Sequence, residues 1–258
     1  MPDTLSRIRF HATRTLMDGA LRLAVAASGP SDRIWRWKNR RADGMVMACG
    51  FGGPAELLDI PEYPVTILAR VGAGTERLEL YDWDASSSPG SGLHRSDFAL
   101  VPDLPAAPMF GPGGIHMFMT QDRGGDKHYF VRAYRDGKPH DSDIVFSKID
   151  SQPTQRRDAA LEVSTASAPS FAWPNSDGDV WTSFLMVLEG PERRLVTGIY
   201  SWDDRWTFPD IRRVPYFYHP ETPRPQLSPG VDYEAVYVAV DRDRWITFLD
   251  SAKFTVPA

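Results

Sequence analysis

The chain has 258 residues, of which 42% are hydrophobic and 24% charged, a composition typical of a globular protein with a substantial core. Its formal net charge of −5 argues against a dominant role in binding nucleic acid or an anionic membrane, since both need a basic face. Cys49 is the only cysteine, which excludes an internal disulfide and a cysteine-based zinc site.

The N-terminal region contains one short apolar run, residues 20–27, interrupted by Arg22. The run is too short to span a bilayer and lacks the layout of a signal peptide. We therefore expect a soluble, cytoplasmic protein without membrane or nucleic-acid partners.

From residue 21 onward, alternating segments of β-branched and aromatic residues separated by turns rich in Gly and Pro predict strands. Five of these segments are similar: each is an apolar strand, a polar turn and a strand that ends in an aromatic residue. The closing aromatic residues are Trp35, Tyr81, Tyr134, Tyr200 and Phe248. Their mean spacing of about 53 residues is close to the length of a propeller blade.

Proline-led stretches precede several of these hairpins, as in residues 59–64 (DIPEYP) and 103–108 (DLPAAP), which suits the first strand of a blade. The sequence therefore predicts an all-β, five-bladed β-propeller that forms a single domain over residues 1–258. The blades are expected at roughly 14–58, 59–102, 103–160, 161–221 and 222–258, with strand 7–13 closing the last one. The alternative is an irregular two-sheet β-sandwich.

Residues 167–206 carry this pattern most clearly and end in YSWDDRW. This stretch resembles the repeats of sialidase-like and lectin-like β-propellers. Ser201, Asp203 and Trp206 lie near a degenerate Asp-box, in which the glycine is absent and the tryptophan comes one residue early. The resemblance implies that this box is a turn on the outside of a blade and takes no part in the chemistry.

Carboxylates at the start of successive blades are the candidate catalytic residues. Asp59 and Asp103 occupy equivalent positions there, and Glu162 precedes the next blade. Equivalent positions in a propeller converge on one axis, so these groups would face a central pocket as an acid and a base. His116, which opens an apolar strand, is the fourth candidate. Turn capping by the aspartates and a hydrogen-bonded strand histidine are the structural alternatives.

Aromatic residues next to acids suit the binding of polar ligands such as sugars, because rings stack while carboxylates accept hydrogen bonds. The candidate ligand-binding residues are Trp83, Asp84, Tyr134, Trp173, Trp202 and Asp203. The alternative is that Tyr81 and Tyr200, which precede the two Trp-Asp pairs, are core residues and that each pair forms a turn.

No metal or cofactor is expected. The one alternative is calcium at residues 140–143 (HDSD), where an imidazole and two carboxylates are close together and oxygen ligands suit a hard cation.

Two functions of different classes remain open. The first is a lectin-like module that binds a carbohydrate or another small polar ligand. The second is an enzyme with one central site, a glycosidase-like hydrolase or a lyase or cyclase. Strong drift between the repeats favours one unique site, but the sequence does not decide whether the protein is catalytic.

Overall fold

The computed structural model describes residues 46–52, 65–72, 74–84, 94–109, 115–120, 127–157, 160–166, 168–173, 180, 182–201, 203–208, 216–218 and 226–257. These residues form four sheets, A to D. Sheet A contains, in spatial order, β1 (Met47–Phe51), β2 (Val65–Arg70), β6 (Ile115–Thr120) and β5 (Ala107–Met109). Sheet B contains β4 (Ala99–Leu100), β3 (Arg77–Asp84), β7 (Lys127–Arg135) and β8 (Lys138–Asp141), with β9 (Val145–Phe146) also paired to β7.

Sheets C and D belong to the second half of the chain. Sheet C contains β10 (Gln155–Arg156), β18 (Ile246–Thr255), β17 (Asp232–Val240), β13 (Thr182–Glu189), β14 (Arg194–Ser201) and β16 (Tyr216–Tyr218). Sheet D contains β11 (Glu162–Ser164), β12 (Ser170–Ala172) and β15 (Arg205–Thr207). All the strand pairs within these sheets are antiparallel except β10 with β18.

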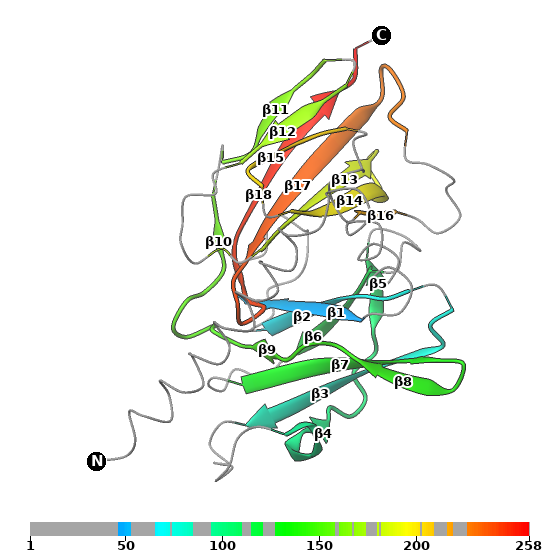
Figure 1. Ribbon diagram of the computed structural model, residues 1–258, viewed down its shortest axis with the longest axis vertical. Helices are drawn as coiled ribbons and strands as arrows, with labels where there is room; N and C mark the ends of the chain where they lie inside the picture. The colour runs from blue at the N-terminus through cyan, green and yellow to red at the C-terminus, as the bar shows by residue number, and fades with distance from the viewer. Residues whose placement is uncertain are drawn as a thin grey trace, which may run out of the picture.

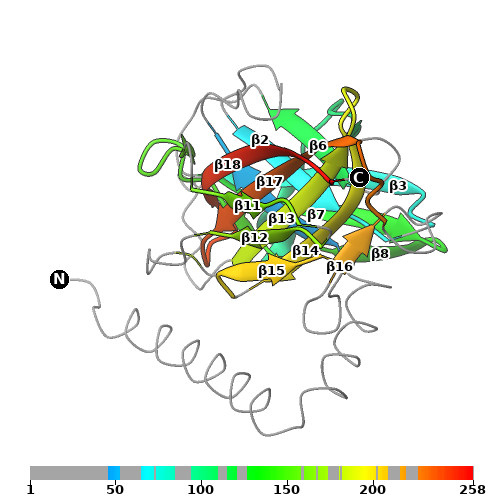
Figure 2. The same ribbon diagram turned by 90° about the horizontal axis from the view of Figure 1, so that it is seen from above.

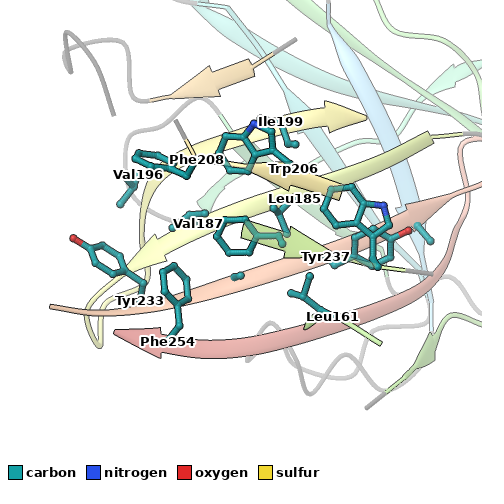
Figure 3. Packing of buried hydrophobic residues seen from close by; sticks show 14 of the residues in the cluster. Leu161, Leu185, Val187, Val196, Ile199, Trp206, Phe208, Tyr233, Tyr237 and Phe254 are labelled. Carbon is teal, nitrogen blue, oxygen red and sulfur yellow. The ribbon is translucent and has the colours of Figure 1, made fainter. Parts of the chain in front are cut away.

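The four sheets pack in the order B, A, C, D. Sheets A and B form one sandwich, the lower half of the molecule in Figure 1, and sheets C and D form a second, the upper half; Figure 2 shows the same sheets from above. One core joins sheets A and B, and contains Ile67 and Val131. A second core joins sheets A and C, and contains Leu68 and Val236. The third joins sheets C and D, and its aromatic side chains are seen in Figure 3.

Sheet C is apolar on both faces because it is an inner layer. In β17, Tyr233 and Tyr237 pack toward sheet D, whereas Val236 and Val238 pack toward sheet A. Successive residues of a strand point to opposite faces, so an inner strand needs a continuous apolar run. An outer sheet packs against another sheet on one face only.

The all-β prediction is confirmed, but the five-bladed propeller and the resemblance to sialidase-like and lectin-like propellers are wrong. The described strands form open, stacked sheets and no radial set of four-stranded blades. The alternative sandwich prediction fits each half. Strand 7–13 and most of the first predicted blade lie outside the described residues; the single-domain extent of 1–258 stays a prediction.

The error arises in the second and third predicted hairpins. Strand β2 joins sheet A and β3 joins sheet B, and β6 and β7 divide in the same way. Therefore β2 pairs with β6 and β3 with β7. The second and third repeats thus pair with each other, first strand with first strand and second with second. The two resulting sheets, A and B, bury an apolar face of each between them. The fourth and fifth hairpins, β13–β14 and β17–β18, pair as predicted.

The supposed Asp-box is a corner at which the chain passes from sheet C to sheet D. Ser201 ends β14, and its hydroxyl accepts a hydrogen bond from the backbone N–H of Asp203 at 3.0 Å. Trp206 then enters the core from β15 and stacks on Phe171, with ring centroids 5.6 Å apart. This corner therefore connects sheet C to sheet D.

The turn between β17 and β18 joins the two sandwiches. Trp245 follows this turn, yet its fully buried side chain belongs to the core between sheets A and B. Its indole N–H donates to the carbonyl oxygen of Gln152 at 2.7 Å. The backbone N–H of Gly50 in β1 donates to the carbonyl oxygen of Arg244 at 2.9 Å. The second half of the chain thus supplies a core residue to the first.

Replacing Gly50 with alanine is expected to destabilise the protein by about 1–3 kcal/mol, because a methyl group overpacks this junction. A Cβ atom at this position would lie 2.8 Å from Val145 Cγ1 and 3.1 Å from Trp245 Cζ3. Urea unfolding of the two proteins measures the difference. Gly137, where an added Cβ meets nothing within 4 Å but φ is +68°, is the control for a purely conformational cost. An unchanged midpoint for Gly50→Ala would contradict this account of the junction.

Candidate functional site

The face of sheet B that points away from sheet A is the candidate site. Leu80 of β3 and Val131 of β7 point into the core between sheets A and B. By strand alternation, Arg77, Glu79 and Tyr81 point to the other side. We call this side the outer face of sheet B.

Side chains on the outer face form four cross-strand rows, as the strand register shows. Arg77 lies opposite Tyr134; Glu79 opposite Arg132, which lies opposite Asp141; Tyr81 opposite both Leu100 and Phe130; and Trp83 opposite His128, which lies opposite Phe146. Aromatic rings, guanidinium groups and carboxylates therefore alternate over about 20 Å, the length of six residues in a strand.

Asp141 holds two arginines in the second row. Arg132 donates to it through Nε at 2.7 Å and Nη2 at 2.9 Å, a bidentate pair. Arg95, from the 3-10 helix η2 (Arg95–Asp97), pairs with Asp141 at 2.7 Å and donates to the Ser142 carbonyl. Hydrogen bonds from Arg132, and then from Arg95, outweigh burial and lower the pKa of the Asp141 carboxyl. The same hydrogen bond raises the pKa of Arg132.

Replacing Asp141 with asparagine is expected to destabilise the protein and to remove part of its acid sensitivity. A carboxyl group with a lowered folded-state pKa contributes stability that is complete above its ordinary value of 3.8. That contribution is lost as the pH falls below 3.8 through the lower folded-state pKa. Unfolding free energies measured from pH 7 to pH 2 should therefore converge for the two proteins at the acid end. Parallel curves would contradict this role of Asp141.

The Glu79 carboxylate accepts hydrogen bonds from the hydroxyl groups of two tyrosines. Its Oε2 accepts from Tyr81 at 2.9 Å and from Tyr134 at 3.0 Å. Burial, followed by the hydrogen bond to Glu79, raises the pKa of Tyr81. Arg77 Nη1 lies 3.3 Å from Glu79 Oε1, and its guanidinium lies 4.0 Å from the centroid of the Tyr134 ring.

The rings make two groups. Tyr81 and Phe130 stack at 4.8 Å with an interplanar angle of 6°, and the guanidinium of Arg132 lies 4.9 Å from the Tyr81 ring. Near the other end of β3, His128 lies between Trp83, at 5.0 Å, and Phe146, at 4.3 Å. Flat apolar surfaces and fixed charges therefore lie side by side on two long strands.

Three of the predicted ligand-binding residues belong to β3 and β7. Trp83 is half-buried on the outer face. Tyr134 lies on the same face, six residues along β7 from His128, the residue opposite Trp83. Asp84 ends β3, opposite Lys127. The structure thus brings Trp83 and Tyr134 to one surface, and their ligand-binding role stays a prediction.

The other predicted ligand-binding residues lie elsewhere. Trp173 is buried between sheets C and D, 5.3 Å from the Tyr237 ring. Asp203 is exposed in the corner before β15. Trp202 lies outside the described residues. Neither Trp173 nor Asp203 lies on sheet B.

The predicted catalytic residues were expected to converge on a propeller axis, and the described sheets have no such axis. His116 is in β6 of sheet A, and Asp103 lies in the turn before β5, with φ of 54°. Glu162 is exposed at the start of β11 in sheet D. Sheet C lies between Glu162 and His116. Asp59 lies outside the described residues, so the catalytic set stays a prediction.

The predicted calcium segment begins within β8, of which His140 and Asp141 are the last two residues, and its two carboxylates are paired with arginines. Asp141 pairs with Arg132, and Asp143 accepts from Arg244 Nε at 3.1 Å. Within the described ranges, no group of three His, Cys, Asp or Glu side chains is arranged to hold a metal ion. In the same ranges, no helix is long and apolar enough to cross a membrane.

Arg77, Arg95 and Arg132 were not among the predicted site residues. The signal for two of them is the alternation in RLELYDWD and HYFVRAYR, which places charged and aromatic residues together on one side of each strand. No sequence pattern indicates Arg95, because it lies in η2 and not in a strand of sheet B. Only the three-dimensional fold brings it to Asp141.

Comparison with known proteins adds little. No protein-family model and no curated protein matches the chain. Among solved structures, the chain is similar to a segment of two fibronectin type-III domains from chicken tenascin, with 13% identity. The match covers 74% of this chain and 92% of that chain, with a TM-score of 0.25. At that score the likeness supports no conclusion about fold or function, and the sheet order given above describes the architecture.

Proposed function

We propose that the protein is a binding module, which holds a small polar ligand on the outer face of sheet B. One observation carries the proposal: four rows of rings, guanidinium groups and carboxylates lie on one outer sheet, on the side away from the core. The solvent side of an outer antiparallel sheet needs only polar residues. Phe130 is itself buried under Tyr81 and Phe98, whereas Tyr81, Trp83 and Tyr134 are half-buried. Partly exposed rings beside fixed charges suit an interaction surface.

The rows are also pre-organised. Arg132 is fixed by Asp141, Glu79 by two tyrosine hydroxyls, and the rings by stacking. Groups that are ordered before binding lose less conformational entropy when a ligand arrives. Strands hold such groups more rigidly than loops do.

Binding suits these groups better than acid–base catalysis. A general acid or base needs a pKa near the working pH. The pKa of Asp141 is lowered and that of Tyr81 is raised, so each shift leads away from neutrality. No observation favours the hydrolase or lyase alternative over binding.

An NMR titration of the intact, ¹⁵N-labelled protein tests the proposal. The probes are three small ring compounds of different charge: benzoate, benzamide and benzamidine. At least one is expected to shift the amide resonances of β3 and β7 while those of β11, β12 and β15 in sheet D stay in place. Thr207→Ala, on the exposed side of β15, is the control variant and should bind as the wild type does. If no probe shifts β3 and β7, or if the shifts fall on sheet D, the proposal fails.

A further inference from the structure

We infer that the ligand of this face is a small planar monocarboxylate and that Arg77 recognises its carboxylate. The inference rests on the proposed function and adds the chemical class of the ligand. It follows from the open donors of Arg77, from the weak pairing of its charge and from the flat side chains beside it.

Arg77 is the most exposed of the three arginines of the face. Its side chain is 59% exposed, against 41% for Arg95 and 26% for Arg132. A guanidinium carries five N–H donors. Arg132 uses Nε, Nη1 and Nη2 on Asp141 and Tyr81. Within the part of the chain that the structure describes, Arg77 has one polar contact, from Nη1 to Glu79.

Arg77 is nevertheless held in place. Its guanidinium lies over the Tyr134 ring at 4.0 Å, and Glu79 fixes Nη1. A stacked guanidinium keeps its in-plane N–H groups available, and these match the two oxygens of a carboxylate in a bidentate pair. Arg77 is therefore a positioned donor.

Arg77 is the arginine of the face whose charge is least paired. Arg132 and Arg95 both pair with Asp141. Among the described residues, Arg77 has one polar contact, of 3.3 Å with Glu79, whose other carboxylate oxygen accepts from two tyrosine hydroxyls. A carboxylate ligand would therefore pair with Arg77 before it paired with Arg95 or Arg132.

The surroundings of Arg77 suit a flat ligand. Tyr134 lies beside it, and the exposed Pro139 of β8 lies opposite Tyr134 on the next strand. Both are flat or rigid apolar groups, which favour a ring or a conjugated chain attached to the carboxylate. A carboxylate on a planar body therefore fits the row Arg77–Tyr134–Pro139.

The test compares benzoate, its neutral isostere benzamide and inorganic phosphate on the intact protein, by NMR titration of the β3, β7 and β8 amides. Benzoate should bind at least about tenfold more tightly than benzamide or phosphate, as a charge-assisted hydrogen-bonded pair requires. Arg77→Gln should lower the affinity for benzoate about tenfold and leave the affinity for benzamide unchanged. Arg77→Lys should give an intermediate affinity for benzoate, because lysine keeps the positive charge but lacks the planar pair of N–H donors.

Arg205→Gln is the matched control. Arg205 is an exposed strand arginine paired with the neighbouring Asp204, but it lies in sheet D. Its loss should change nothing. Equal affinities for benzoate and benzamide, or no effect of Arg77→Gln, would overturn the inference and leave the proposed function standing. Tighter binding of phosphate would overturn the carboxylate assignment. Failure of benzoate, benzamide and phosphate would overturn the inference, and failure of benzamidine as well would overturn the proposed function.

Discussion

Replacing Trp245 with alanine is expected to lower the free energy of unfolding by about 3–5 kcal/mol, the usual cost of removing a large buried aromatic side chain. The side chain is fully buried in the core between sheets A and B, although it follows a turn of sheet C. The substitution leaves a cavity and also leaves the Gln152 carbonyl without its indole donor. Urea unfolding, followed by circular dichroism, measures the loss.

Trp83→Ala is the control, because Trp83 is half-buried on the outer face of sheet B and leaves no enclosed cavity. It should destabilise the protein much less than Trp245→Ala. A loss of less than about 1 kcal/mol for Trp245→Ala would be too small for a buried aromatic side chain. Such a result would show that this tryptophan does not join the two sandwiches.

Replacing Asp241 with alanine is expected to cost about 2–4 kcal/mol, because it removes a buried carboxylate that has three partners. Asp241 Oδ1 accepts from the backbone N–H groups of Asp243 and Trp245 at 2.9 and 3.0 Å. Its Oδ2 accepts from Lys148 at 2.6 Å. The substitution leaves two turn N–H groups without an acceptor and loosens the turn that holds Trp245.

Asp204→Ala is the matched control for this substitution. Asp204 also forms a hydrogen-bonded pair with a cation, Arg205, but both are exposed, so its loss should change stability little. Thermal unfolding of the three proteins separates the outcomes. If Asp241→Ala melted with the wild type, the turn would not depend on its carboxylate.

The sequence predicts most of the strands and little of their pairing. The hairpins β13–β14 and β17–β18 formed, because each buries its two strands side by side in sheet C. The hairpins expected between β2 and β3 and between β6 and β7 did not form, although their patterns are similar. Alternation fixes which side of a strand is apolar, but the choice between two equally apolar partner strands depends on packing between sheets.

Tyr81 and Tyr200 show the same limit at single residues. Both precede a tryptophan in similar motifs, and a core position was the structural alternative for both. Tyr200 is buried between sheets A and C, whereas Tyr81 lies on the outer face of sheet B and contacts Arg132. The difference comes from the layer: β14 is in an inner sheet and β3 in an outer one. A local motif does not specify the layer.

The candidate site was predictable only in part for the same reason. Trp83 and Tyr134 were selected for their aromatic character, which does not depend on the fold. The convergence of Asp103, Glu162 and His116 depended on a propeller axis, and the sheets separate Glu162 from His116. The Asp141 pairs with Arg132 and Arg95 needed long-range geometry that no spacing in the sequence reveals.

A crystal structure of the intact protein grown with benzoate tests the central claim most directly. The account predicts one benzoate on the outer face of sheet B, with its carboxylate on the Arg77 guanidinium and its ring against Tyr134. Benzoate bound on sheet D or in the corner at Asp203, with the outer face of sheet B empty, would contradict it.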